Sequence, residues 1–310
     1  MKRAFTLLEL VVVIVVLGII AMMSFNAIMN IYSNYFQAKT VNELETQTEI
    51  ALEQISKRLE HRIKPSVIAR KTDGDFLALN DNRVNLDAKY EILEFIPYAY
   101  EIFNDVPSGS NKAGRYSGYA DLAKSSPATG LISPGSNFST EVVETIKDLT
   151  CRDDTRNDKC VDFTKKDGGV VAIFSDIYYN VQDSFGYKGD ITKLDIAKVG
   201  VKSTDGNTLE ISGFDGKQIS EQYHLAYTAN AIVPEQSADP KDAANGVFDL
   251  NLYYDYRPWM GQGYKNGEKA TLAKNVTRFV FTEKNGVIVL KLCMRAKNSE
   301  ITICKSKAVY

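Results

Sequence analysis

The sequence predicts an α+β protein, in which a long N-terminal α-helix packs on an antiparallel β-sheet domain with long loops. Three observations predict this class. Residues 10–23 are 14 consecutive apolar or glycine residues, helical spacing of apolar residues continues to Pro65, and the second half contains strand-like segments separated by turn residues. We expect a membrane-spanning helix over 5–27, an amphipathic continuation over 28–64 and one globular domain over 65–310.

The apolar segment from Phe5 to Phe25 is long enough to cross a bilayer as a helix. Its 21 residues are interrupted only by Thr6, Glu9 and Ser24, and a hydrocarbon core of about 30 Å needs about 20 helical residues. A cleaved secretory signal would have a similar apolar core. It would also end in small residues of the A-x-A kind, a pattern that this segment lacks.

Two basic residues, Lys2 and Arg3, precede the apolar segment. Basic residues are enriched on the cytoplasmic side of membrane helices, so the N-terminus is expected in the cytoplasm. The rest of the chain would then lie outside it, in the periplasm of a cell with an inner membrane.

The helix is expected to continue beyond the membrane with one apolar face. Pro65 stops the pattern, so the helix should run from about Phe5 to about Lys64, a length of about 90 Å at 1.5 Å per residue. The second half should pack on a sheet, because its apolar or small residues recur at steps of three and four. These residues are Val41, Leu44, Thr48, Ala51, Leu52, Ile55, Leu59 and Ile63.

The middle of the chain has few regular elements. Residues 91–103 are rich in Ile, Phe and Tyr and predict a strand. Residues 107–135 are rich in Gly, Ser and Pro and predict long loops. Residues 139–149 predict a short helix, and residues 151–160 form a polar stretch with a cysteine at each end.

From Gly169 onward the pattern is that of strands. An Asn285-Gly286 pair between two of them predicts a tight hairpin. The expected strands are 170–174, 208–212, 223–233, 247–254, 276–282, 287–294 and 300–305.

The four cysteines fit two disulfides in an oxidising compartment, although four cysteines allow three connectivities. If the last two strands turn around residues 298 and 299, Cys293 and Cys304 face each other at a separation near the disulfide range. We favour the pairs Cys151–Cys160 and Cys293–Cys304, because both close short local loops.

Charge and motif content give no indication of an enzyme. The formal net charge is −2, without the basic excess of a nucleic-acid-binding protein. Neither a phosphate loop nor a dinucleotide-binding glycine pattern stands in a suitable context. The only two histidines are His61, expected to be solvated, and His224, expected within a sheet. No catalytic residue, cofactor or bound metal is therefore expected.

Two segments leave alternatives open. The acidic residues Asp153, Asp154 and Asp158 supply oxygen ligands that calcium prefers, but interleaved Arg and Lys residues favour a solvated charged loop. The aromatic segment 253–260 combines Tyr, Arg and Trp, as interface anchors do. Packing of this segment under a loop is the slightly favoured alternative.

The residues A-F-T-L-L-E-L, Ala4 to Leu10, resemble the class III signal of type IV prepilins and pseudopilins. The resemblance implies a leader peptide of residues 1–4, cleavage by a prepilin peptidase between Ala4 and Phe5, and N-methylation of the new terminal Phe5. Glu9 matches the family's acidic position. The resemblance implies an assembly role for Glu9, in which its carboxylate meets the terminal amine of a neighbouring subunit. Each charge alone is costly in a membrane, and the pair offsets both costs.

The resemblance covers about 25 residues and has two departures. Ala4 stands where the family usually has Gly. Processing is still expected, because Ala is also a small residue. Asn26 stands where many members have Pro, so no proline-linked break is expected in the helix there.

The resemblance implies a pilin-like fold and a structural subunit of a type II secretion pseudopilus or a type IV pilus. The implied partners are other pilins or pseudopilins, prepilin peptidase, the inner-membrane assembly platform and membrane lipid. The segment 270–295 also resembles the C-terminal sheet of J-type pseudopilins and PilW-like minor pilins, and the chain length favours a minor subunit. The alternative is a membrane-tethered periplasmic binding protein or enzyme unrelated to filaments.

Overall fold

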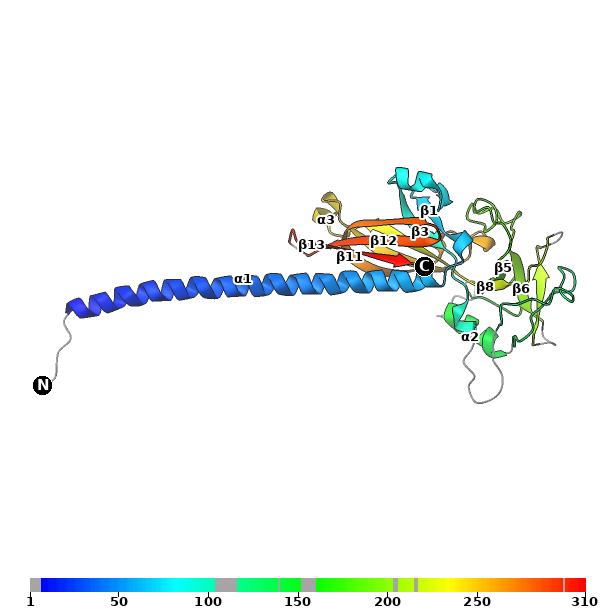
Figure 1. Ribbon diagram of the computed structural model, residues 1–310, viewed down its shortest axis with the longest axis horizontal. Helices are drawn as coiled ribbons and strands as arrows, with labels where there is room; N and C mark the ends of the chain where they lie inside the picture. Colours follow the sequence, from blue (N-terminus) through cyan, green and yellow to red (C-terminus); the bar gives the residue numbers. More distant parts are fainter. Residues whose placement is uncertain are drawn as a thin grey trace.

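The computed structural model describes residues 7–103, 116–138, 140–151, 160–202, 206–214, 217–297 and 299–310. One long helix, α1 (Leu7–Glu60), leads from the N-terminal side into a globular part at its other end (Figure 1). The described strands of that part form two antiparallel sheets, which confirms the α+β architecture expected from the sequence.

Helix α1 is continuous through Asn26, as expected, but it ends at Glu60 rather than at Lys64. The backbone leaves the helix because it pairs with a second segment of the chain. The Ile63 N–H donates to the Ile96 carbonyl at 2.8 Å, and the Tyr98 N–H donates to the His61 carbonyl at 2.9 Å. The same pairing ends the strand expected over 91–103, and that strand stops at Phe95.

The larger sheet has the order β13-β12-β11-β10-β9-β3-β1-β2 among the described strands. Its strands β9 to β13 form a meander in which each strand pairs with the next along the chain. The expected Asn285-Gly286 hairpin joins β11 to β12, and both residues have positive φ, as a type I′ turn requires. In chain order the strands are β1 (Ile68–Lys71), β2 (Phe76–Ala78), β3 (Tyr90–Phe95), β9 (Ala229–Gln236), β10 (Phe248–Tyr256), β11 (Glu268–Lys284), β12 (Val287–Arg295) and β13 (Thr302–Val309).

The smaller sheet is built from the chain between β3 and β9, which are themselves neighbours in the larger sheet. It lies beyond the C-terminal end of α1 (Figure 1). The helix expected over 139–149 is present as α2 (Thr140–Thr150), and a short α3 (Pro240–Ala244) precedes β10. In sheet order the strands are β4 (Leu131–Ile132), β7 (Thr208–Ser212), β6 (Ala197–Val201), β5 (Val171–Phe174) and β8 (Tyr223–Ala226).

The single strand expected over 223–233 is wrong. The chain crosses there from the smaller sheet to the larger one, between β8 and β9. At this crossing, polar groups form hydrogen bonds to residues at the end of β10 rather than to a neighbouring strand. The Thr228 hydroxyl accepts the Asp255 N–H at 2.9 Å, and the Tyr227 carbonyl accepts the Arg257 Nε at 3.1 Å.

Three clusters of buried apolar side chains hold these layers together. One lies between α1 and the larger sheet, one belongs to the smaller sheet and α2, and one fills the junction of the two sheets. Trp259 lies in the junction with 1% of its surface exposed, and its indole N–H donates to the Gly169 carbonyl at 3.0 Å. The aromatic segment 253–260 therefore packs mainly inside the protein rather than standing out as an interface anchor.

Candidate assembly site

The N-terminal half of α1 stands clear of the globular part (Figure 1). Every large apolar side chain from Leu7 to Phe36 is at least 47% exposed. The exposed residues surround the helix on all sides, whereas a helix on the surface of a soluble domain keeps only one apolar stripe. This half of α1 therefore needs a surrounding of lipid or of other apolar helices.

Among the described residues, α1 is the one helix long and apolar enough to cross a membrane. At the globular end of this apolar half, three aromatic side chains follow one another on the helix. The rings of Tyr32 and Phe36 stack at 6.2 Å, and the ring of Tyr35 meets Phe36 edge-on at 5.9 Å. Aromatic residues are enriched where membrane helices enter water, so this group fits the outer boundary of a membrane span.

Glu9 lies in the first turn of α1 and is exposed on the apolar half of the helix. A carboxylate next to a helix N-terminus is favoured by the helix dipole. In hydrocarbon an ionised carboxylate still costs several kcal/mol without a nearby positive charge. The surroundings of this helix end thus decide whether Glu9 is tolerated. Ala4 and Phe5, the expected cleavage and methylation positions, lie outside the described residues.

The second half of α1 is fixed to the larger sheet by the apolar stripe expected from the sequence. Its buried members include Leu44, Leu52, Ile55 and Leu59, and they pack on β11, β12 and β13. The apolar half is thereby held in a fixed direction relative to the globular part.

Ion pairs to β13 flank this stripe. The Lys305 Nζ lies 2.7 Å from the Glu49 carboxylate, and Lys307 pairs with Glu53. The hydrogen bond from Lys307 lowers the pKa of Glu53. This arrangement was not predicted from the sequence, although Glu49 and Glu53 are one helical turn apart and Lys305 and Lys307 share one face of a strand.

Arg62 closes the end of this helix–sheet contact and was also missed. It is buried, and its guanidinium donates to the carbonyls of Leu59 at 2.8 Å, Gly286 at 2.9 Å and Tyr310 at 3.1 Å. These three acceptors belong to the last turn of α1, the β11–β12 turn and the end of β13. One side chain therefore joins the three elements that set the direction of α1.

The cysteines lie in the pairs favoured from the sequence. The sulfur atoms of Cys293 and Cys304 are 2.05 Å apart, and those of Cys151 and Cys160 are 2.11 Å apart, both at disulfide distance. Cys293 and Cys304 are direct partners in the β12–β13 register, as the expected turn at 298 and 299 requires. This pair ties β13, the strand that carries the lysines, to its neighbour.

The two histidines contact the same tyrosine at the junction of the two sheets. His61 is not simply solvated, because its Nδ1 lies 3.1 Å from the Tyr98 hydroxyl and its ring stacks on Tyr100 at 4.1 Å. His224 lies in β8, within a sheet as expected, and stacks on Tyr98 at 5.0 Å. Burial lowers the pKa of His224, which fits a packing role.

No group of three or more potential metal ligands occurs among the described residues. The acidic residues Asp153, Asp154 and Asp158 lie outside them, so the alternatives for that loop stand as stated. Within the described part of the chain, the candidate features for assembly are thus the exposed apolar helix, Glu9 on it, and the contacts that fix its direction.

Comparison with known proteins agrees with this geometry. Residues 1–25 match the family described as the prokaryotic N-terminal methylation motif. No curated protein and no solved structure matches the chain. The motif and the exposed apolar helix fit a single-pass inner-membrane anchor, and they point to a structural subunit rather than an enzyme. The match to residues 1–25 supports the resemblance of the N-terminus to type IV pilins and pseudopilins.

Proposed function

We propose that this protein is a minor pseudopilin or minor pilin, a structural subunit of a type II secretion pseudopilus or a type IV pilus. The observation that supports this most is that the methylation motif continues directly into an apolar helix half exposed on all sides. Among the described residues, no part of the chain covers this apolar surface. It is first covered by lipid in the inner membrane and later by the helices of neighbouring subunits in the filament.

The mechanism is assembly. Prepilin peptidase cleaves between Ala4 and Phe5 and the new N-terminus of Phe5 is methylated. The Glu9 carboxylate then pairs with the terminal amine of a neighbouring subunit. Because both charges are costly in an apolar surrounding, only a neighbour with the correct stagger along the helix offsets them. The pair thereby sets the register of the filament.

The size of the globular part supports a minor rather than a repeating subunit. The smaller sheet lies beyond the end of α1 that faces away from the membrane half (Figure 1). A subunit at the filament tip has no copy above it, so a bulky element at that end needs no space within a repeat. The partners would be other pilins or pseudopilins and the inner-membrane assembly platform, with the globular part in the periplasm before assembly.

The first test is the intact mass of the protein extracted from membranes. We expect loss of residues 1–4 and gain of one methyl group, and an uncleaved mass in a strain without active prepilin peptidase. An uncleaved mass in the peptidase-positive strain would exclude the proposal. It would favour the membrane-tethered binding protein or enzyme instead.

The assembly step is tested with Glu9→Val. We expect this variant to be cleaved and methylated but not incorporated into sheared or purified filaments. Glu60→Val is the matched control, because Glu60 is exposed at the opposite end of α1. Equal incorporation of both variants and the native chain would refute the pairing mechanism.

The type of filament is tested by the secreted proteome of a deletion strain, a complemented strain and the wild type. Loss of particular proteins from the medium, with their accumulation in the periplasm, would assign the subunit to type II secretion. Unchanged secretion would assign it to a pilus, with motility and DNA uptake as the next assays.

A further inference from the structure

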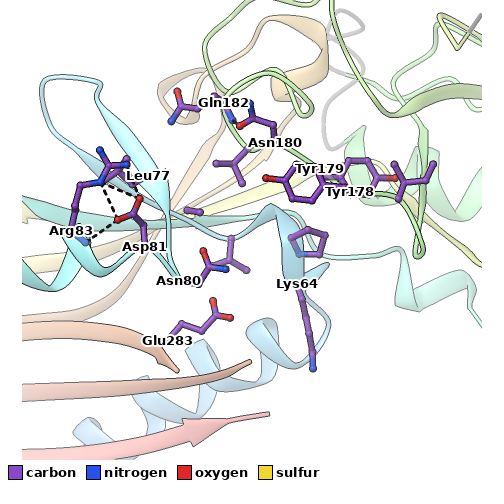
Figure 2. Close-up of a pocket in the computed structure, with 15 residues that line it drawn as sticks. Lys64, Leu77, Asn80, Asp81, Arg83, Tyr178, Tyr179, Asn180, Gln182 and Glu283 are labelled. Atoms are coloured by element: carbon purple, nitrogen blue, oxygen red, sulfur yellow. Dashed lines mark hydrogen bonds and ion pairs between the residues drawn. The ribbon is translucent and has the colours of Figure 1, made fainter. Parts of the chain in front are cut away.

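A cleft of about 420 Å³ opens between the two sheets. One wall comes from the connection after α1 and from the turn after β2, with Lys64, Asn80, Asp81 and Arg83 (Figure 2). The other wall is the loop 177–182, which follows β5 of the smaller sheet. Clefts between structural units are preferred places for small-ligand sites, and this volume lies within their usual range.

The two walls are fixed relative to each other. The Gln182 side chain donates from Nε2 to the carbonyl of Phe76 in β2 at 2.8 Å, which ties the loop to the larger sheet. The Tyr179 hydroxyl is buried and bonds the N–H of Phe174 at 2.8 Å and its carbonyl at 3.0 Å. The Asn180 N–H is held by the Ser184 hydroxyl at 2.9 Å. The cleft therefore has a defined width without a ligand.

Tyr178 is the exception in this anchored loop. Its neighbour Tyr179 is buried and Ile177 is partly buried, yet Tyr178 lines the cleft with 90% of its surface exposed. Because the backbone on both sides of Tyr178 is anchored, ligand binding needs to order only its side chain. This side chain offers a flat apolar face with a polar edge.

The charges of the cleft balance one another. Arg83 donates to both oxygens of Asp81, with Nη2 to Oδ2 at 2.7 Å, and this contact lowers the pKa of Asp81 to about 2. Burial raises the pKa of Glu283, and the positive charge of Lys64 opposes this. Two acids and two bases thus line the cleft, which favours a ligand without net charge. Across the cleft from Tyr178, Asn80 and the paired Asp81–Arg83 groups supply planar hydrogen-bonding groups (Figure 2).

We propose that this cleft binds a neutral oligosaccharide, with Tyr178 stacked on a sugar face and Asn80 and the Asp81–Arg83 pair bonded to its hydroxyl groups. A sugar presents an apolar face of C–H groups and a rim of hydroxyl groups, and the cleft presents the matching combination. The inference does not depend on filament assembly, because no residue of the cleft belongs to the apolar half of α1.

Binding is tested on the full chain in lipid nanodiscs, because glycoside detergents carry sugar head groups that would compete. The probes are chitotetraose, cellotetraose and maltotetraose, with trigalacturonate as an anionic comparison, measured by saturation-transfer NMR and calorimetry. We expect at least one neutral probe to bind and trigalacturonate to bind more weakly. Tyr178→Ala should weaken the binding about tenfold, in line with the loss of one aromatic contact.

Tyr119→Ala is the matched control, because Tyr119 is an exposed tyrosine outside the cleft. It should leave the affinity unchanged, while Asn80→Ala, at an exposed position of the cleft, should weaken binding as Tyr178→Ala does. Both cleft substitutions are on the surface, so circular dichroism should show native folding. Absence of neutral-sugar binding at about 10 mM would overturn the proposal. Equal binding by Tyr178→Ala, or capture of peptides but not sugars in the cleft, would do the same.

Discussion

Arg62 gives the sharpest test of how α1 is attached to the larger sheet. Truncation by Arg62→Ala removes three hydrogen bonds that a buried guanidinium donates to the carbonyls of Leu59, Gly286 and Tyr310. The carbonyls of Gly286 and Tyr310 lie at partly exposed or exposed positions, so water can replace the lost donors there. The Leu59 carbonyl is in a buried turn and loses its side-chain donor.

The expected loss of unfolding free energy follows from these contacts. A hydrogen bond to a charged group contributes about 1.5–3 kcal/mol. Rehydration of two of the three acceptors recovers part of this, so we expect Arg62→Ala to cost about 3 kcal/mol in total. Arg58→Ala is the matched control, since Arg58 is an exposed arginine in the last turn of α1. It has the same effect on the helix dipole and should cost less than about 0.5 kcal/mol.

The loss should also depend on pH through Glu283. Burial raises the pKa of Glu283, and the positive charges of Arg62 and Lys64 oppose the rise. Without Arg62 the pKa of Glu283 rises further above its unfolded value. A raised carboxyl pKa means stability that is present below the unfolded pKa and lost as pH rises through the folded pKa. The cost of Arg62→Ala should therefore grow with increasing pH above about 4.5.

The assay is urea unfolding of the full chain in nanodiscs at pH 4.5 and pH 7.5. The fluorescence of Trp259, the single tryptophan, reports the sheet junction, and hydrogen exchange of the β13 amides reports the contact with α1. Addition of Glu283→Gln should remove the extra pH dependence of Arg62→Ala. If Arg62→Ala and Arg58→Ala unfold at the same urea concentration, the assigned role of Arg62 is refuted.

Three further predictions concern the globular part. Burial lowers the pKa of His224, so the unfolding free energy should fall as pH drops below about 6.5. In urea titrations, His224→Phe should flatten this pH dependence between pH 5 and 7. An unchanged slope would contradict the assignment. The double variant Cys293→Ser/Cys304→Ser opens a loop with a sequence separation of 11. Its unfolding free energy should be about 2–3 kcal/mol lower in the same titrations. A loss below about 0.5 kcal/mol would show that the pair does not constrain the chain. Gly186 has φ +85°, and a Cβ there would lie 2.4 Å from the Pro258 carbonyl oxygen, so Gly186→Ala should lower the melting temperature by more than Gly189→Ala, where φ is similar and space is open.

The elements governed by local pattern could be predicted from the sequence. The helix stripe from Leu44 to Leu59 follows from apolar spacing, and the β11–β12 hairpin follows from the Asn285-Gly286 pair. The facing cysteines Cys293 and Cys304 follow from the turn between two strands. In each case residues close in sequence determine the geometry.

The smaller sheet was not predicted as a separate layer, because its identity depends on contacts between distant segments. β8 and β9 form one uninterrupted strand-like stretch in the sequence, and the hydrogen bonds of Thr228 and Tyr227 to Asp255 and Arg257 mark where they separate. The cleft was missed for the same reason, since Asn80 and Tyr178 line one cleft only after the two sheets pack. The role of Arg62 likewise rests on acceptors more than 200 positions away in the chain.

The pairing of β3 with β9 has a consequence for the order in which the protein folds. Phe95 and Asn230 are partners in that ladder, and the chain between them forms the whole smaller sheet. The closure of such a long loop is slow, whereas the hairpins of β10 to β13 close over short distances. In the proposed orientation, with an N-terminal membrane anchor and an exported globular part, these hairpins are exported after the earlier strands. We therefore expect the larger sheet to be completed only after export, with the C-terminal meander as the template on which the earlier strands and α1 dock.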